Sequence, residues 1–449
     1  MNTAPGSLEP ALAALVGAPQ VVSGPACAAL AVGGKAPQYL VTPPNAESVA
    51  AVLKFAAEHD LGVIPRGNGS KMAWGNRPRR YDLALSLRAL NHVWHYEPAD
   101  LTITVEAGMN LADLEEFLER DGLWLPLDPP GGACASLGGI LATNSSGPLR
   151  LRFGSARDMV LGIKVATAEG KLIKSGGRVV KNVAGYDLCK LLVGSYGTLG
   201  VIVEASFKLF PRPAARATWA LEAGSLGLAR DIRRHILDSP LEPLRLALFN
   251  GAALELMSSE PASAGTPRLE LWVEAGGAES ILARYARDLA EIGRSMGVPC
   301  RPLDAPSAAA AWARLGDYER LFAGSFPEVL LLKAALPLSS SEEFLSFAQQ
   351  LAEGNAVQMA AFAQVGVGVV HLGLWGQGIA ALTERLVTAM RKAAAGLGGV
   401  LLAEGYPRGF EAERDAWGQA GDSLEAMRRL KAAWDPRGVL SPGRFVGGI

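Results

Sequence analysis

Three glycine-rich segments in the first half of the chain have the composition of anion-binding loops. The first, residues 66–71 (Arg-Gly-Asn-Gly-Ser-Lys), directly follows an apolar stretch that is typical of a strand. Successive glycines let several backbone N–H groups converge on one anion, an arrangement that suits a pyrophosphate. The second segment spans residues 128–147 and the third spans residues 194–202. Taken alone, each is equally typical of an ordinary turn.

The glycine patterns of two common nucleotide sites are missing from this sequence. No G-x-G-x-x-G opens a strand–helix–strand unit, and no G-x-x-x-x-G-K-[ST] loop occurs. These absences argue against a Rossmann site and a P-loop site.

The histidines and cysteines do not form a metal-binding motif. The chain has 5 His and 4 Cys, with no C-x-x-C among them, which is too scattered for an iron–sulfur cluster or a cysteine-based zinc site. His92 and His95 are close in sequence, but Trp94 and Tyr96 beside them indicate a strand edge. We therefore favour a structural or solvated histidine pair and predict no metal site.

Composition excludes several classes of protein. The 43 Lys and Arg residues nearly balance the 44 Asp and Glu residues, so the chain is not a globally basic nucleic-acid binder. The scattered cysteines favour a reducing cytoplasm, and residues 1–22 lack the basic start of a secretory signal. The most membrane-like stretch, 359–382, is interrupted by glycines and His371, so we predict paired buried strands and no transmembrane segment. We expect a cytoplasmic protein, at most peripheral at the inner membrane.

Alternating strand and helix patterns surround the glycine segments. Asn45 is a typical N-cap for an amphipathic helix, and a short strand at 63–64 follows that helix and precedes the first segment. Residues 101–106 alternate branched and polar side chains, as a half-buried strand does, and Asn110 precedes a second amphipathic helix. Further strands are expected at 163–167 and 171–174, paired as a hairpin, and at 205–210.

A proline-bounded break at 211–213 predicts a domain boundary. Beyond it, helices alternate with strands and reverse hairpins, which favours an α+β fold. The expected helices are 226–237, 280–296 and 379–394, and the expected strands are 244–249, 269–274, 329–334 and 365–374.

The order of the three glycine segments resembles the PCMH-type FAD-binding domain of the vanillyl-alcohol oxidase superfamily. An R-G-x-G-S loop, an Asp-Pro followed by Ser-Leu-Gly-Gly, and a G-S-x-G-T-L-G-V-I segment occur in the family's order within residues 40–213. The resemblance implies an α+β fold, in which two subdomains of the FAD-binding domain hold an extended FAD and an α+β cap domain follows. The implied divisions are an N-terminal extension (1–36), the FAD-binding domain (37–213), the cap (214–425) and a C-terminal segment that packs back on the FAD-binding domain (426–449).

The same resemblance implies which residues bind FAD. The first loop and Ser136–Gly139 would hold the pyrophosphate, and the backbone of Val201 and Ile202 would pair with the adenine end. Family members that tether the flavin through histidine carry it at the position of Ser70 here, so we predict noncovalent FAD. The full predicted set is Arg66, Gly67, Asn68, Gly69, Ser70, Lys71, Asp128, Pro129, Ala135, Ser136, Gly138, Gly139, Asn144, Ser145, Gly147, Gly200, Val201 and Ile202.

Within the family, the chain is most similar to glycolate oxidase and the D-2-hydroxy-acid dehydrogenases. Residues 148–158, with Arg152-Phe153-Gly154 and Asp158, fit a pattern of that group, as do residues 176–187. The related dehydrogenases also carry a cap motif, H-x-G-D-G-N-x-H, that binds a divalent metal. A second motif, with Glu-His, supplies a metal ligand and the catalytic base.

Both cap motifs are eroded in this sequence. His371 is retained, but Gly378 stands in place of the second histidine; Glu404 is retained, but Gly405 stands in place of the base. One imidazole and one carboxylate are too few for a catalytic metal site of this type. The catalytic residues are therefore left open, with His371, Glu404 and Lys333 as candidates. Relatives place a cation for the substrate carboxylate where Lys333 lies, although a lysine extending off a strand is equally expected.

The erosion resembles the FAD-binding subunit of bacterial glycolate oxidase. That resemblance implies a flavin that accepts or relays electrons beside two partners, a catalytic FAD-binding subunit and an iron–sulfur subunit, in the oxidation of a small 2-hydroxy acid. One alternative is a standalone FAD-dependent D-lactate or glycolate dehydrogenase. Another is a noncatalytic scaffold that has lost its flavin.

Overall fold

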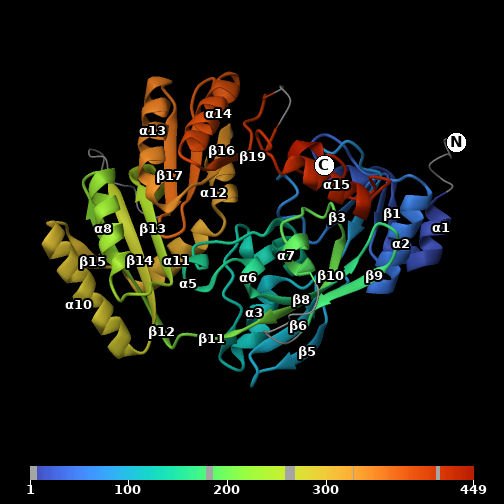
Figure 1. Cartoon of the computed structure of the whole chain (residues 1–449), viewed down its shortest axis with the longest axis horizontal. Coiled ribbons are helices and arrows are strands. Elements are labelled where there is room, and N and C mark those ends of the chain that lie inside the picture. Colours follow the sequence, from blue (N-terminus) through green and yellow to red (C-terminus); the bar gives the residue numbers. More distant parts are fainter. Residues whose placement is uncertain (1–7, 178–185, 258–267, 327, 411–414) are drawn as a thin grey trace. The chain divides into compact units, whose positions relative to one another are not determined.

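The computed structural model describes residues 8–177, 186–257, 268–326, 328–410 and 415–449, and these fall into two compact units (Figure 1). The motif at 176–187 therefore lies largely outside the described residues. The first unit comprises Met1–Ser146, Ser155–Arg212 and Arg414–Ile449, and the second comprises Gly147–Gly154 and Pro213–Glu413.

One sheet of the first unit carries the first glycine segment at the end of a strand. Its order is β1 (Val21–Ser23), β2 (Tyr39–Val41), β4 (Leu83–Ser86) and β3 (Val63–Arg66), and β4 pairs in parallel with both β2 and β3. Helix α2 (Ala46–Glu58) buries its apolar residues in the core beneath this sheet. The Asn45 side chain accepts a hydrogen bond from the Ser48 N–H at 2.8 Å, which confirms the predicted N-cap.

The second sheet of this unit is antiparallel and carries the third glycine segment. Its order is β5 (Val93–Glu97), β6 (Thr102–Glu106), β10 (Val201–Lys208), β8 (Val160–Ala166) and β9 (Leu172–Gly176), and β8 and β9 form the predicted hairpin. Strand β5 is an edge strand, as the aromatic neighbours of His92 predicted, and His92 Nδ1 lies 3.0 Å from Glu106 Oε2. Strand β10 begins four residues earlier than expected, at Val201.

Short helices and one small strand pair complete the first unit. The other elements are α1 (Glu9–Val16), η2 (Ala18–Gln20), η3 (Gly24–Leu30), α3 (Leu111–Glu119), β7 (Leu123–Trp124), η4 (Gly132–Cys134), α4 (Leu137–Thr143), α6 (Ala156–Met159), α7 (Leu188–Leu192), β11 (Phe210–Pro211), α15 (Leu424–Trp434) and η6 (Val446–Gly448).

The second unit is built on one antiparallel sheet with helices on both faces. The strand order is β15 (Cys300–Pro302), β12 (Ala215–Ala223), β14 (Leu269–Gly277), β13 (Arg245–Asn250), β17 (Gln358–Gln364), β18 (Val369–Trp375), β16 (Val329–Ala335) and β19 (Val400–Gly405). One face packs against α8 (Leu226–Asp238), α10 (Glu279–Met296), α13 (Ser341–Gly354) and α14 (Ile379–Gly396). The other face packs against α9 (Gly251–Met257), α11 (Ala305–Leu315) and α12 (Tyr318–Ser325). The remaining elements are α5 (Arg150–Phe153) and η5 (Leu338–Ser340).

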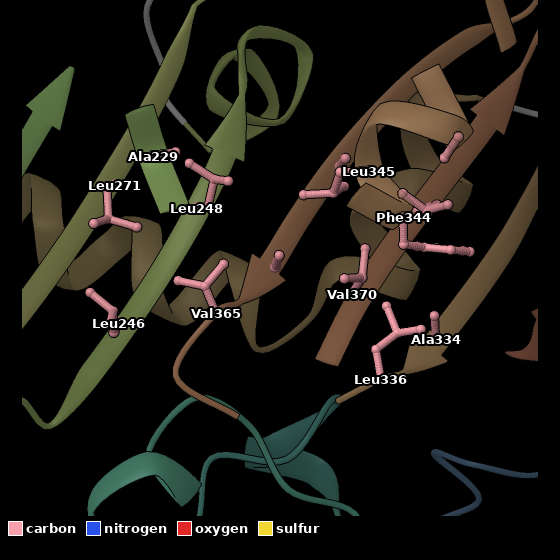
Figure 2. Packing of buried hydrophobic residues seen from close by; sticks show 14 of the residues in the cluster. Ala229, Leu246, Leu248, Leu271, Ala334, Leu336, Phe344, Leu345, Val365 and Val370 are labelled. Carbon is pink, nitrogen blue, oxygen red and sulfur yellow. The ribbon is translucent and has the colours of Figure 1, made fainter. Parts of the chain in front are cut away.

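The first of these faces is a dense aliphatic core. Figure 2 shows Leu246 and Leu248 on β13 beside Leu271 on β14, and Val370 on β18 near Phe344 of α13. Because side chains alternate along each strand, the residues between them point to the opposite face. That alternation places polar side chains of β16, β18 and β19 together on the α12 side.

One sequence expectation needs correction in this unit. The strand expected at 365–374 begins only at Val369, because residues 365–368 form the turn of the β17–β18 hairpin. At Gly368, φ is +72° and a Cβ would lie 2.1 Å from the Leu336 carbonyl oxygen, so the turn requires glycine. The hairpin itself confirms the paired buried strands expected in 359–382. In the described part of the chain, no helix is long and apolar enough to cross a membrane.

Residues 147–154 lie between two stretches of the first unit in the sequence. They pack with the second unit. A Cβ on Gly366 would come within 2.6 Å of the Leu151 side chain, and Arg152 Nη1 lies 2.8 Å from Glu242 Oε2. Burial of Leu151 against the aliphatic core is the physical reason for this assignment.

Candidate functional site

The first glycine segment presents a row of unused backbone donors. Strand β3 ends at Arg66, and the chain then turns through Gly69, where φ is +81°. Within the described chain, the N–H groups of residues 67–70 donate to no protein atom. Consecutive N–H groups of this kind form an anion-binding concavity. The geometry therefore suits a diphosphate at the position that the sequence predicted.

The first and second segments lie in direct contact. A Cβ on Gly67 would come within 2.0 Å of Ser136 Oγ, so only glycine allows the two backbones to approach this closely. Asn68 Nδ2 donates to the Cys134 carbonyl at 2.9 Å and also to Asn110 Oδ1. The first and second segments are thus joined by close backbone packing and by the hydrogen bond from Asn68 to Cys134.

A buried lysine adds a further hydrogen bond between the first and second segments. Lys71 Nζ donates to the Pro130 carbonyl at 2.7 Å and lies 5.4 Å from the Trp74 ring centroid. The predicted residues Asp128 and Pro129 immediately precede this carbonyl, and the carbonyl of Ala135 accepts from the Leu111 N–H at 3.0 Å.

The N–H groups of residues 137–139 donate to protein atoms within the first unit. The Leu137 and Gly138 N–H groups donate to the Met109 and Ala107 carbonyls, and Gly139 N–H donates to Ser136 Oγ at 3.3 Å. These N–H groups already have acceptors, so residues 137–139 offer no free N–H donors. Their glycines instead allow the backbone to pack closely against neighbouring segments. A Cβ on Gly138 would lie 2.9 Å from Ala107, which shows why glycine stands there.

The turn after α4 contains a buried polar atom without a partner. Ser145 Oγ is fully shielded and, within the described chain, forms no hydrogen bond. Such a group costs free energy unless a ligand or water satisfies it. The neighbouring Asn144 adopts a left-handed conformation (φ +46°), and its Oδ1 accepts from the Arg157 N–H at 3.2 Å. Ser145 therefore fits a cofactor contact, and Asn144 shapes the turn. Gly147 begins the segment that packs with the second unit.

The third segment presents a strand edge. The pairing of β10 with β6 stops at Glu204, whereas Val201 and Ile202 pair with β8 alone. Their outer edge fits the predicted pairing with an adenine ring. Gly200 has a packing role, since a Cβ there would lie 2.5 Å from Val165 Cγ1.

The second unit brings the three candidate catalytic residues together. Lys333 on β16, His371 on β18 and Glu404 on β19 occupy neighbouring strands and point to the same face. Lys333 Nζ lies 3.6 Å from Glu404 Oε1, and His371 Nδ1 lies 3.8 Å from Glu404 Oε2. The hydroxyl of Tyr318, on α12, donates a hydrogen bond to Glu404 Oε2. We call these four residues the cap cluster.

Burial and charge fix the protonation states of the cap cluster. Burial alone would raise the pKa of Glu404, but Lys333, His371 and the Tyr318 hydroxyl outweigh it and lower that pKa to about 2. Burial lowers the pKa of His371 more than Glu404 raises it, so the imidazole is neutral at pH 7. Phe362 stacks on this imidazole with ring centroids 4.5 Å apart. The cluster is a neutralised ion pair beside an uncharged histidine.

The cap cluster does not fit a divalent metal. The Glu404 carboxylate is already engaged by Lys333 and Tyr318, and no group of three potential His, Cys, Asp or Glu ligands exists among the described residues. Glycine at 378 and 405 supplies neither a ligand nor a base. At Gly405 a Cβ would lie 3.1 Å from Leu331, so a histidine there would also require Leu331 to move.

Sequence reasoning missed Tyr318 and Phe362 as neighbours of the candidate residues. Phe362 lies directly opposite His371 in the β17–β18 register, so a correct placement of the hairpin turn would have found it. Tyr318 arrives from a helix distant in sequence, and no local pattern signals its contact with Glu404.

Comparison with known proteins matches both units. Residues 37–176 match the family described as FAD binding domain, and residues 212–445 match the family described as FAD linked oxidases, C-terminal domain. The chain is 28% identical to the glycolate oxidase subunit GlcD of Bacillus subtilis, over 91% of this chain and 89% of that one. It is 30% identical to a D-lactate dehydrogenase of Archaeoglobus fulgidus, over 91% of each chain. It is also 40% identical to the glycolate oxidase subunit GlcE of Escherichia coli, over 41% of this chain and 51% of that one.

Solved structures share the fold at lower identity. An alkyldihydroxyacetonephosphate synthase superposes with a TM-score of 0.78 at 17% identity, covering 99% of this chain and 86% of that one. A p-cresol methylhydroxylase superposes with a TM-score of 0.74 at 15% identity, covering 98% of this chain and 96% of that one. These likenesses confirm the predicted fold class.

Proposed function

Because the chain belongs to the FAD-linked oxidases and carries an FAD-binding domain, we propose a function within that family. The chain is the FAD-binding subunit of a complex that oxidises a small 2-hydroxy acid, as glycolate oxidase does. The first unit holds FAD noncovalently, and a partner flavoprotein chain removes hydride from the substrate. An iron–sulfur chain carries the electrons away.

One observation carries this proposal. The Glu404 carboxylate is neutralised by Lys333 and bonded by Tyr318, and Gly378 and Gly405 stand where a metal ligand and a base would be needed. Oxidation of a 2-hydroxy acid requires removal of the hydroxyl proton as hydride leaves. In the described cap cluster, His371 has the neutral imidazole that such a proton transfer needs. Its ring, however, is enclosed by Phe362 and Tyr318.

The chain's own residues supply the binding of the flavin. The N–H groups of residues 67–70 bind the diphosphate, Ser145 Oγ accepts a ligand hydrogen bond, and the free edge at Val201 and Ile202 receives the adenine. Bound FAD supplies a two-electron acceptor. Serine at position 70 leaves no histidine for a tether, which supports the noncovalent mode.

The names of two relatives support a role within a complex. GlcD and GlcE are both described as subunits of glycolate oxidase, and this chain matches GlcD over most of its length. The match to a D-lactate dehydrogenase over 91% of each chain favours one alternative, a standalone FAD-dependent dehydrogenase that uses Lys333 or His371 on the substrate.

Co-expression separates these two functions. The chain is produced alone and together with a flavoprotein that carries the complete metal and base motif and a chain with C-x-x-C clusters. Dye reduction is then measured with glycolate and with D-lactate. We expect turnover by the isolated chain to be roughly 10²–10⁴-fold below that of the complex, which is the usual contribution of a general base.

Equal turnover by the isolated chain would contradict the subunit role and favour the standalone dehydrogenase. The absorption spectrum of the same preparation decides the remaining alternative. A flavin band excludes a scaffold without cofactor, and a colourless chain that takes up no FAD would contradict both flavin-dependent functions.

A further inference from the structure

Residues 416–445 contact the third glycine segment and the residues directly after the first, all within the first unit. Lys431 of α15 donates from Nζ to the Thr198 carbonyl at 2.7 Å, to the Leu440 carbonyl at 2.8 Å and to Asp435 Oδ2 at 2.6 Å. Asp435 in turn accepts from the Val439 and Leu440 N–H groups. Lys431 therefore ties the third glycine segment to a rigid turn.

Arg444 makes a corresponding connection to the residues that directly follow the first segment. Its guanidinium donates to the Asn76 carbonyl at 3.0 Å, to the Met72 carbonyl at 2.9 Å and to the Trp74 carbonyl. Arg444 is 6% exposed, and burial lowers its pKa to about 10, so it stays charged at neutral pH. The chain directly after the 66–71 loop thus winds around one buried cation.

The backbone of the same stretch completes the attachment. The Asn76 N–H donates to the Arg444 carbonyl at 3.0 Å, and a Cβ on Gly75 would lie 2.7 Å from that oxygen, so glycine is required there. The Val63 N–H donates to the Val439 carbonyl at 2.8 Å. Residue 439 thereby extends the sheet beside β3, the strand that leads into the loop.

Aromatic side chains hold the third segment in a strained form. Tyr196, in the middle of that segment, has a φ of +55°, which is unfavourable for any residue with a Cβ. Its ring packs edge-on against Trp417, with centroids 4.6 Å apart, and stacks on Phe445 at 5.5 Å. Both partners belong to the same C-terminal stretch.

We propose that residues 416–445 form a latch that sets the conformation of the first and third FAD-binding loops, with Lys431 and Arg444 as positioning residues for the cofactor. The proposal rests on the FAD site described above. The proposal implies that FAD binding and latch docking are coupled, and such coupling is reciprocal. FAD must stabilise the docked latch by the same factor by which the latch strengthens FAD binding.

Limited trypsin digestion of the full chain tests the coupling without any variant. Arg428 and Arg429 are exposed on α15, and Arg120 is an exposed site of the first unit outside the latch. We expect saturating FAD to slow cleavage at 428–429 roughly 5- to 150-fold, the usual size of such coupling, and to slow it more than cleavage at Arg120. Equal slowing at both sites, or none at 428–429, would overturn the latch.

FAD titration of apoprotein variants tests the two positioning residues. Arg444→Ala should raise the FAD dissociation constant by the same factor, and Arg444→Lys should recover part of the loss because an ammonium still reaches one carbonyl. Arg120→Ala is the control, since Arg120 is exposed and lies outside both the latch and the loops. If Arg444→Ala does not fold, Lys431→Gln takes its place.

The outcomes of the titration separate the latch from the proposed function. The latch would be refuted if the control and the latch variant that folds (Arg444→Ala or Lys431→Gln) had equal dissociation constants for FAD. Failure of the wild-type chain itself to bind FAD would instead refute the proposed function.

Discussion

Replacing Gly67 with alanine is expected to weaken FAD binding roughly 5- to 150-fold, the equivalent of the about 1–3 kcal/mol that overpacking usually costs. The new Cβ would lie 2.0 Å from Ser136 Oγ and 2.6 Å from Ser136 Cβ. The first loop must therefore move, which displaces its row of unused N–H groups. Titration of the apoprotein with FAD, followed by flavin fluorescence, measures the change.

Two further variants identify the cause of that loss. Gly177→Ala adds the same methyl group at an open position of the first unit, outside the glycine segments and the latch, and should leave FAD affinity unchanged. The double variant Gly67→Ala/Ser136→Gly removes the colliding side chain, and glycine replaces a serine N-cap at a cost of only a few tenths of a kcal/mol. It should recover most of the affinity. Unchanged binding by Gly67→Ala would show that the loop does not hold the diphosphate.

Replacing Lys333 with methionine is expected to lower the free energy of unfolding by about 3 kcal/mol. Removal of one partner of a buried ion pair usually costs about 3–5 kcal/mol, and partial exposure of Lys333 favours the lower end. The remaining Glu404 carboxylate would be buried without its cation. Urea unfolding at pH 7 of the wild type, Lys333→Met and Lys333→Met/Glu404→Gln measures the loss, and the double variant should recover part of it.

The pH dependence of the same unfolding checks the charge states. The pKa of Glu404 is lowered from 4.5 to about 2, so its stabilisation is complete above pH 4.5 and is lost as pH falls towards 2. The pKa of His371 is also lowered, so its contribution is complete above pH 6.5 and declines below it. In Lys333→Met the carboxylate loses a cation and its folded-state pKa rises towards the unfolded value, so the loss of stability between pH 4.5 and pH 2 should become smaller. Identical pH profiles for the two proteins would contradict the ion pair.

Local patterns in the sequence predicted the elements that depend on neighbouring residues. The Asn45 cap, the β8–β9 hairpin and the helices α8, α10 and α14 all follow from capping, alternation and helical spacing within a short window. The glycine loops were also visible, because a backbone that approaches another backbone or an anion leaves room for no other residue.

Contacts between distant segments could not be predicted in this way. Nothing near residue 318 indicates that its hydroxyl meets Glu404, and nothing near Leu151 indicates that its side chain packs in the second unit. The hydrogen bonds of Arg444 join residues separated by more than 360 positions. The start of β18 was misplaced because residues 365–368 are as apolar as the strands they connect, so hydrophobicity alone gives no signal for the turn.

Anaerobic mixing of the isolated, FAD-loaded chain with excess glycolate or D-lactate tests the central claim most directly, with the flavin absorbance followed over time. Dithionite added to a parallel sample provides the control that the flavin can be reduced. The flavin is predicted to stay oxidised with either acid and to bleach at once with dithionite. Rapid bleaching by either acid would mean that this chain removes the hydroxyl proton and hydride itself, and the subunit role would have to be abandoned.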